Sequence, residues 1–329
     1  MPININDPQI QRILTHPEET DSGWRADLQR FEQNDLTLDR RTAAENSVKG
    51  LQRLLIFLGY STSSSGSYLI DGDFGPGTNR AIAQFQFEHG LNANLQREAL
   101  CYDCTFKTAS KLISAVPNER LNLPTLERML AVARQNIDTN QVACGDFEVA
   151  MFQLDALHKR RALSCREINQ QYGAQAVEAA ARLKTEKKLD IRPEWMLSII
   201  RKETEGVVRP KFEQHILSKS NFKTPQADLT ELRYRATSFG LGQVMGFNFE
   251  AVGAPSAKAM FCSPLVEQVQ FVGKFLAKGG SSVRAALSKT DPVEADFRAV
   301  AKFYNGPLYE ANHYHESLAK WFAEFRSFG

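Results

Sequence analysis

The sequence predicts a mainly α-helical protein with more than one domain. Its 329 residues exceed the usual length of a single domain. Apolar residues recur at helical spacing in separate parts of the chain, and stretches rich in glycine and serine divide these parts. We therefore expect two or three helical domains with at most a small β-hairpin or sheet.

Composition and charge are those of an ordinary globular protein, with 43% hydrophobic and 24% charged residues. Forty basic and 38 acidic residues leave a net charge of +2, so we expect neither nucleic acid nor an anionic membrane surface as a partner. No uncharged stretch is long and apolar enough to span a membrane, so no membrane insertion is expected. The N-terminus lacks the pattern of a Sec signal, so we expect synthesis in the cytoplasm without Sec export. The protein is expected to be a monomer.

The five cysteines, an odd number, predict free thiols rather than a disulfide framework. Cys101 and Cys104 have the spacing of half a zinc site, but no second pair of this kind follows. We therefore expect no metal and no cofactor.

The N-terminal third divides into an arm and a helical module. Residues 1–42 are polar and predict a loosely packed arm. A helical apolar stripe then runs from Ala43 to Gly59, followed by a serine-rich loop and a turn with three glycines. Thr78 is expected to be the N-cap of the next helix.

This stretch resembles the small three-helix peptidoglycan-binding domains that are appended to cell-wall hydrolases. The resemblance covers residues 43–118 and implies a third helix near 105–114. It also implies a wall-binding role for Asp71, Phe74, Thr78 and Gln86. The matching residues are Val48, Leu51, Gln52, Leu55, Leu58, Gly59, Tyr60, Asp71, Gly72, Phe74, Gly75, Thr78, Ala81, Phe85 and Gln86. Residues 119–168 are expected to form a helical connector.

The helix that begins at Pro193 carries the candidate catalytic group. Glu203 follows Ile199 and Ile200 by four and three positions, so it continues the apolar stripe. Glu205 lies on the polar face, where Arg201 can pair with it. Gly206 is expected to end the helix and to open backbone space beside Glu203. Burial would raise the pKa of Glu203, but periodicity alone leaves a simple outward orientation equally open.

Three later motifs accompany this helix. They are Phe212-Glu213-Gln214-His215, the glycine-rich stretch 237–248, and Tyr304-Asn305-Gly306-Pro307. Glycines around Gln243 allow the backbone to approach a flat ligand, and aromatic and amide side chains suit sugar recognition. Each motif alone is weak evidence.

Together with Glu203-Thr204-Glu205-Gly206, these motifs resemble the N-acetylmuramidase family of modular phage endolysins, within the lysozyme-like superfamily. Thr204 and Phe239 replace the serine and tyrosine of the family pattern. The resemblance implies a lysozyme-like, α-rich catalytic domain at 169–329. It implies hydrolysis of the β-1,4 bond between N-acetylmuramic acid and N-acetylglucosamine in bacterial peptidoglycan, with Glu203 as the general acid.

The same resemblance suggests further site residues. Glu213 is the nearest candidate by sequence for a second carboxylate that activates water. The alternative is that Glu213 only holds His215 or a strand. Ser238, Gln243, Tyr304 and Asn305 are candidates for binding the glycan. His313 and His315 have the spacing of a metal-binding pair, but no third ligand lies nearby, so surface histidines are expected.

Two other functions remain open. A lytic transglycosylase would use a substrate hydroxyl in place of water and would release anhydro-muropeptides. A wall-binding phage tail component would have no catalysis. The chain is expected to act in the periplasm, released by a phage holin or injected by a secretion system. If the protein is injected by a secretion system, an immunity protein would be a partner. The order of the two domains favours release by a phage holin.

Overall fold

The computed structural model describes residues 7–17, 26–27, 29–30, 33, 38–91, 121–223 and 228–328. Helices dominate these residues, and the sheet is small, which confirms the mainly α prediction. The expected third helix near 105–114, and the pair Cys101 and Cys104, lie outside the described residues. In the part of the chain that the structure describes, no helix combines the length and apolar character needed to cross a bilayer.

The chain forms two compact units. Unit 1 contains residues 1–160 and 210–238, and unit 2 contains residues 161–209 and 239–329. Residues 210–238 therefore belong to unit 1, although the sequence pattern groups them with the C-terminal domain. The chain passes from one unit to the other three times.

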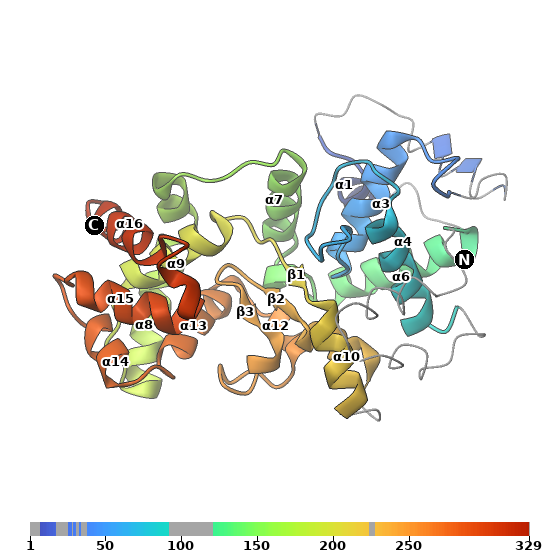
Figure 1. Ribbon diagram of the computed structural model, residues 1–329. Helices are drawn as coiled ribbons and strands as arrows, with labels where there is room; N and C mark the ends of the chain where they lie inside the picture. Colours follow the sequence, from blue (N-terminus) through green and yellow to red (C-terminus); the bar gives the residue numbers. More distant parts are fainter. Residues whose placement is uncertain are drawn as a thin grey trace. The chain divides into compact units, whose positions relative to one another are not determined.

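The core of unit 1 lies among five helices (Figure 1). They are α1 (Pro8–Leu14), α3 (Glu45–Phe57), α4 (Pro76–Glu88), α6 (Leu123–Asp138) and α7 (Phe147–His158). Ile10 and Ile13 of α1 are buried in this core, so the expectation of a loosely packed arm is wrong for α1. The fully enclosed Arg53 stabilises this packing, because its guanidinium donates to the Ile13 carbonyl at 2.8 Å and to Asp155 at 2.7 Å.

The inserted segment adds a second apolar cluster to unit 1. It contains β1 (Lys211–Phe212), α10 (Gln214–Lys223), α11 (Leu229–Arg235) and the start of β2 (Thr237–Phe239). Phe212, Leu217 and Leu232 pack with Ala83 of α4. The sheet has the order β1-β2-β3, with β3 at Val244–Met245. In the antiparallel β1–β2 pair, Lys211 lies opposite Ser238.

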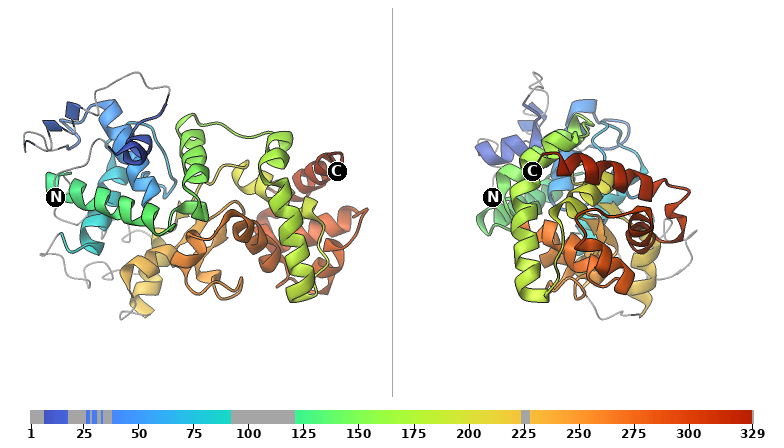
Figure 2. Two further views of the ribbon diagram at one scale, coloured as in Figure 1. Left: turned by 180° about the vertical axis from the view of Figure 1, so that it is seen from behind. Right: turned by 90° about the vertical axis from the view of Figure 1, so that its left-hand side faces the viewer.

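Unit 2 is a helical bundle around α9 (Pro193–Thr204), which packs against its neighbours α8, α13 and α16 (Figure 1 and Figure 2). The elements of unit 2 besides α9 are α8 (Cys165–Lys187), η3 (Gly246–Asn248), α12 (Ala257–Phe261), α13 (Leu265–Leu276), α14 (Ser281–Leu287), α15 (Glu294–Asn305), η4 (Pro307–Tyr309) and α16 (Tyr314–Arg326). Unit 1 also contains the short helix η2 (Ala143–Gly145). The fully buried Trp195 of α9 has its ring centroid 5.0 Å from each of Phe297 and Phe322. This packing holds α9 in the middle of the bundle.

Candidate active site

The end of α9 presents a partly buried carboxyl group. Pro193 at the first helical position begins the helix, and Ile199 and Ile200 are fully buried on its inner face. Glu203, at the expected continuation of that face, is partly enclosed. Burial raises the pKa of the Glu203 carboxyl, while the hydrogen bond from Tyr314 and the charge of Lys202 act in the opposite direction. The raised pKa favours the protonated form that a general acid needs.

Tyr314 is the polar partner of this carboxyl group. It begins α16, is 1% exposed, and its hydroxyl donates to Oε1 of Glu203 at 2.5 Å. Burial and the neighbouring Glu203 charge raise the pKa of Tyr314 well above its usual range. The tyrosine therefore keeps its proton and remains a donor to Glu203.

Glu205 lies on the other side of the helix end, as its position on the polar face predicts. It forms ion pairs with Arg201 at 3.5 Å and with Arg209 at 3.1 Å. Glu205 adopts the left-handed conformation, with φ of 54°, and Gly206 follows with φ of 77°. The expected space beside Glu203 is absent at Gly206, because a Cβ there would lie 2.7 Å from Ile168. Gly206 instead allows close packing onto α8.

The turn between β2 and β3 is attached directly to the end of α9. Thr204 donates to the Leu241 carbonyl at 2.8 Å, and Tyr304 donates to the Gly242 carbonyl at 2.7 Å. A Cβ on Gly242 would lie 2.3 Å from Val272 and 2.9 Å from the Tyr304 hydroxyl. This glycine is therefore required by close packing against protein side chains, whereas the sequence pattern suggested approach of the backbone to a flat ligand.

Two candidate glycan-binding residues are occupied by local hydrogen bonds. The Gln243 amide donates to the Gly240 carbonyl at 3.3 Å, and Gln243 has φ of 52°. Asn305 accepts from the Asn312 side chain at 3.0 Å. Burial and the charge of Glu203 raise the pKa of Tyr304 well above its usual range. The structure thus brings Glu203, the 240–243 turn and the end of α15 together in unit 2.

Glu213 and Ser238 belong to unit 1. Glu213 forms ion pairs with Lys211 at 3.0 Å and with His215 at 3.6 Å. Ser238 is 8% exposed and its hydroxyl lies 3.5 Å from the Lys211 carbonyl oxygen, across the β1–β2 pair. Both residues therefore have contacts that stabilise the strand pair and the turn into α10.

Three of the four wall-binding candidates, Asp71, Phe74 and Thr78, lie in or next to the glycine-rich turn of unit 1, and Gln86 lies near the end of α4. Gln52 organises this turn: its amide donates to Asp71 at 2.8 Å and accepts from the Gly72 backbone at 2.9 Å. Phe74, Thr78 and Gln86 are buried, and Gln86 donates to Thr125 at 3.0 Å. These three side chains therefore pack within the module, whereas Asp71 is partly exposed.

Two expectations about individual residues are wrong. Thr78 is not the N-cap, because α4 begins at Pro76, whose fixed φ suits the first helical position; Thr78 instead donates to the Asp73 carbonyl at 3.0 Å. His315 is not a surface residue. It is 5% exposed and packs edge-on against Tyr309 with ring centroids 5.5 Å apart. Among the described residues, no group of three or more histidine, cysteine or acidic side chains could hold a metal ion.

Comparison with known proteins assigns two parts of the chain. Residues 44–94 match the family model described as "Putative peptidoglycan binding domain", and residues 222–326 match the N-acetylmuramidase model. The chain combines a peptidoglycan-binding domain with a muramidase domain. These two domains support peptidoglycan hydrolysis as the activity and peptidoglycan as the substrate.

The chain is also similar to a solved structure titled "Crystal structure of Burkholderia AP3 phage endolysin". The TM-score is 0.36 at 20% sequence identity, and the similarity covers 89% of this chain and 99% of that chain. The curated proteins contain no match to the sequence. The N-acetylmuramidase match begins after α9, so it includes Gln243, Tyr304 and Tyr314 but not Glu203.

Sequence reasoning missed Lys202 and Tyr314, and it named Thr204 only as a member of the family motif. Thr204, Lys202 and Tyr314 all connect the end of α9 to distant parts of unit 2. Tyr314 lies in the motif His313-Tyr314-His315, where the histidines drew attention to metal binding. No local pattern indicates that the tyrosine between them reaches Glu203, since 111 positions separate the two residues.

Proposed function

We propose that the muramidase domain hydrolyses the β-1,4 bond between N-acetylmuramic acid and N-acetylglucosamine, with Glu203 as the general acid. The observation that carries the proposal is the state of Glu203: burial raises the pKa of its carboxyl, and Tyr314 holds one of its oxygens. A carboxyl group whose pKa is raised keeps its proton to higher pH and is able to donate it to a leaving group. Glu203 lies outside the family match, so its assignment depends on the residue pattern and this geometry.

In the proposed reaction, Glu203 protonates the glycosidic oxygen as the bond to the anomeric carbon breaks. Positive charge develops on the sugar ring in the oxocarbenium-like transition state. Water then adds to the anomeric carbon and leaves a reducing end. The 240–243 turn and the Tyr304-Asn305 segment would bind the glycan next to Glu203, since both contact the end of α9 or its attached turn.

Glu213 is the proposed group for activating the water. Replacement of Glu213 by glutamine tests the role, because glutamine keeps the shape of the side chain and removes the base. Loss of turnover with unchanged thermal stability would support a catalytic role, whereas reduced stability with turnover retained would assign Glu213 to holding Lys211 and His215.

The peptidoglycan-binding domain would keep the enzyme on the wall, and the site of action would be the periplasm. Release by a phage holin is the proposed route, with injection by a secretion system as the alternative.

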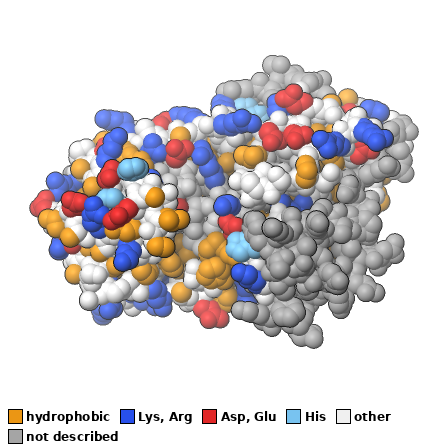
Figure 3. All heavy atoms as spheres, in the orientation of Figure 1, with side chains coloured by type: hydrophobic (Ala, Val, Ile, Leu, Met, Phe, Trp, Pro, Cys, Tyr) orange, Lys and Arg blue, Asp and Glu red, His pale blue; other side chains and the backbone are white. Residues whose placement is uncertain are grey.

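The described face of the protein has basic and acidic side chains interspersed (Figure 3), in agreement with the net charge of +2. Such a surface suits a largely neutral glycan better than a polyanion.

Product analysis tests the proposed reaction directly. Purified peptidoglycan is digested to completion, and the released muropeptides are examined by mass spectrometry with and without borohydride reduction. Hydrolysis predicts N-acetylmuramic acid at reducible ends. Anhydro-muramic ends, which borohydride does not reduce, would contradict hydrolysis and assign the enzyme as a lytic transglycosylase. Reducible N-acetylglucosamine ends would contradict the proposed bond.

A further inference from the structure

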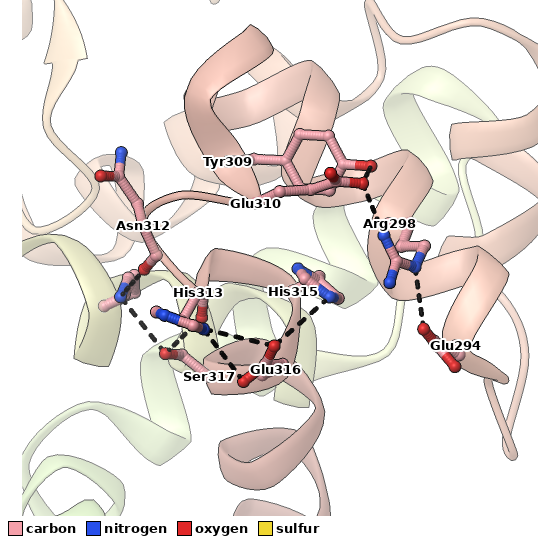
Figure 4. A network of polar contacts seen from close by, with 10 residues as sticks. Glu294, Arg298, Tyr309, Glu310, Asn312, His313, His315, Glu316 and Ser317 are labelled. Carbon is pink, nitrogen blue, oxygen red and sulfur yellow. Dashed lines mark hydrogen bonds and ion pairs between the residues drawn. The ribbon is translucent and has the colours of Figure 1, made fainter.

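The start of α16 is held firmly against the end of α9. Lys202, the residue before Glu203, donates to the Asn312 carbonyl and to the Ser317 hydroxyl, each at 3.2 Å. The Ser317 hydroxyl in turn donates to the His313 carbonyl at 2.8 Å (Figure 4). These bonds surround the first residue of α16 on both sides. Contacts within the protein therefore hold Tyr314 in position before any substrate binds.

The residue before Tyr314 has an unusual backbone conformation. His313 has φ of 47°, in the left-handed region that side-chain-bearing residues rarely adopt. Seven described non-glycine residues have positive φ, and three of them, Glu205, Gln243 and His313, lie at this site. Such backbone geometry persists only where the surrounding contacts enforce it, and it concentrates at functional sites. The chain therefore keeps a costly turn directly before the tyrosine that contacts Glu203.

We propose that Tyr314 is a positioning residue that selects the carboxyl oxygen from which Glu203 delivers its proton. This inference rests on the proposed function of Glu203. Because the Tyr314 hydroxyl donates to Oε1, that oxygen is the acceptor, and the acidic hydrogen of the neutral carboxyl lies on Oε2. Tyr314 thereby presents Oε2 as the proton donor to the glycosidic oxygen.

The hydrogen bond also contributes during the reaction. As the Oε2–H bond breaks, a new O–H bond forms on the glycosidic oxygen, and the electron pair of the anomeric C–O bond passes to that oxygen. Glu203 becomes a carboxylate, while Tyr314 retains its own proton. A hydrogen bond to a charged carboxylate is stronger than one to a neutral carboxyl, so the contact from Tyr314 strengthens as the proton leaves.

Three ionisable side chains from three helices face Glu203. Lys202 belongs to α9, Tyr304 to α15 and Tyr314 to α16. Lys202 and the Tyr314 hydroxyl both favour the carboxylate, and both tyrosines remain neutral because burial raises the pKa of each well above its usual range. Removal of the Tyr314 hydroxyl therefore leaves Lys202 as the one described group that lowers the pKa of Glu203, and this pKa rises.

The test is Tyr314→Phe, measured in two ways on the full-length protein. Carbon-13 NMR of labelled glutamate carboxyl groups follows the titration of Glu203 without substrate, with Glu203→Gln used to assign the signal. The expected result is a higher pKa for Glu203. The pH–rate profile on purified peptidoglycan should show its alkaline limb moved upward and kcat lowered about ten- to hundredfold, as for loss of a hydrogen bond to a charged group, with KM little changed.

Tyr172→Phe is the matched control. The buried Tyr172 donates its hydroxyl to the Gly206 carbonyl at 2.6 Å, close to the end of the same helix. This variant also removes one buried hydrogen bond, but its partner is a neutral backbone group. Tyr172→Phe should lower the stability of the protein and leave the pKa of Glu203 unchanged. Equal shifts of the Glu203 pKa in both variants would overturn the proposal, as would no shift in Tyr314→Phe.

A second substitution covers the case in which Tyr314→Phe does not fold. Site-specific 3-fluorotyrosine at position 314 keeps the shape of the side chain and makes its hydroxyl a stronger donor. The pKa of Glu203 should then fall, opposite to the phenylalanine variant, and an unchanged or raised value would contradict the proposal. Because the NMR titration needs no substrate, it remains decisive even if Glu203→Gln shows that the proposed function is wrong.

Discussion

Arg233 and Glu88 lie 145 positions apart and form an enclosed ion pair inside unit 1. The Arg233 Nε and a Glu88 carboxylate oxygen are 2.7 Å apart, and the side chains are 3% and 1% exposed. Tyr60 donates to the same carboxylate at 2.6 Å, and Arg233 donates to the Gly59 carbonyl at 2.5 Å. Arg233 lies within the muramidase match, whereas Gly59 and Glu88 lie within the peptidoglycan-binding match. A segment within the muramidase match therefore completes the packing of the region that matches the peptidoglycan-binding model.

The first prediction follows from this ion pair. Arg233→Met should lower the free energy of unfolding of unit 1 by about 3–5 kcal/mol, because it leaves the Glu88 charge buried without its partner. Urea denaturation measures the loss, and hydrogen exchange should become faster in α3 and α4. Arg298→Met is the control, since its partners Glu294 and Glu310 are 73% and 61% exposed, and a much smaller loss is expected from exposed ion pairs. Equal losses in the two variants would contradict the structural role of the pair.

The close packing of the β2–β3 turn gives the second prediction. In Gly242→Ala, the new methyl group would press against Val272 and against the Tyr304 hydroxyl. We expect a loss of about 1–3 kcal/mol in stability from overpacking, with a lower kcat because the turn beside Glu203 must move. Gly280→Ala is the matched control, since its Cβ would meet no atom within 4 Å. Thermal unfolding and turnover on peptidoglycan measure both effects; full activity in Gly242→Ala would separate this turn from the site.

The pKa of Glu203 predicts a dependence of stability on pH. Burial raises this pKa in the folded protein above its value in the unfolded chain, so folding favours the protonated form. The associated stability is fully present below the ordinary glutamate pKa and is lost as the pH rises through the folded value. Glu203→Gln, which is always neutral, should be as stable as the native protein at low pH and more stable at neutral pH. A difference that is the same at every pH would contradict the raised pKa.

Local pattern placed Glu203 on the apolar face of α9, and the family resemblance made it the catalytic candidate. Helical spacing from Ile199 and Ile200 determines which face Glu203 occupies, and Glu205 pairs with Arg201 for the same reason. The helix starts at Pro193 because the conformation of proline suits that position. These are properties of neighbouring residues, so they are visible in the sequence.

Long-range packing was not predictable in this way. Ile10 and Ile13 of the arm enter the core of unit 1, and residues 210–238 pack in the same unit, because distant apolar faces and the Arg233–Glu88 pair meet in three dimensions. Phe74 and Gln86 are likewise buried within the module. Their motif positions indicate the family but do not distinguish a ligand contact from a structural one.

Activity of Glu203→Gln provides the strongest test of the proposed acid. The variant and the native protein are incubated with purified peptidoglycan, and both wall binding and release of muropeptides are measured at the pH of highest native activity. Glutamine preserves the size of the side chain but cannot donate the proton, so we predict unchanged wall binding and a loss of turnover of about 10²–10⁴-fold. Turnover at the native rate, with wall binding retained, would show that another group supplies the proton.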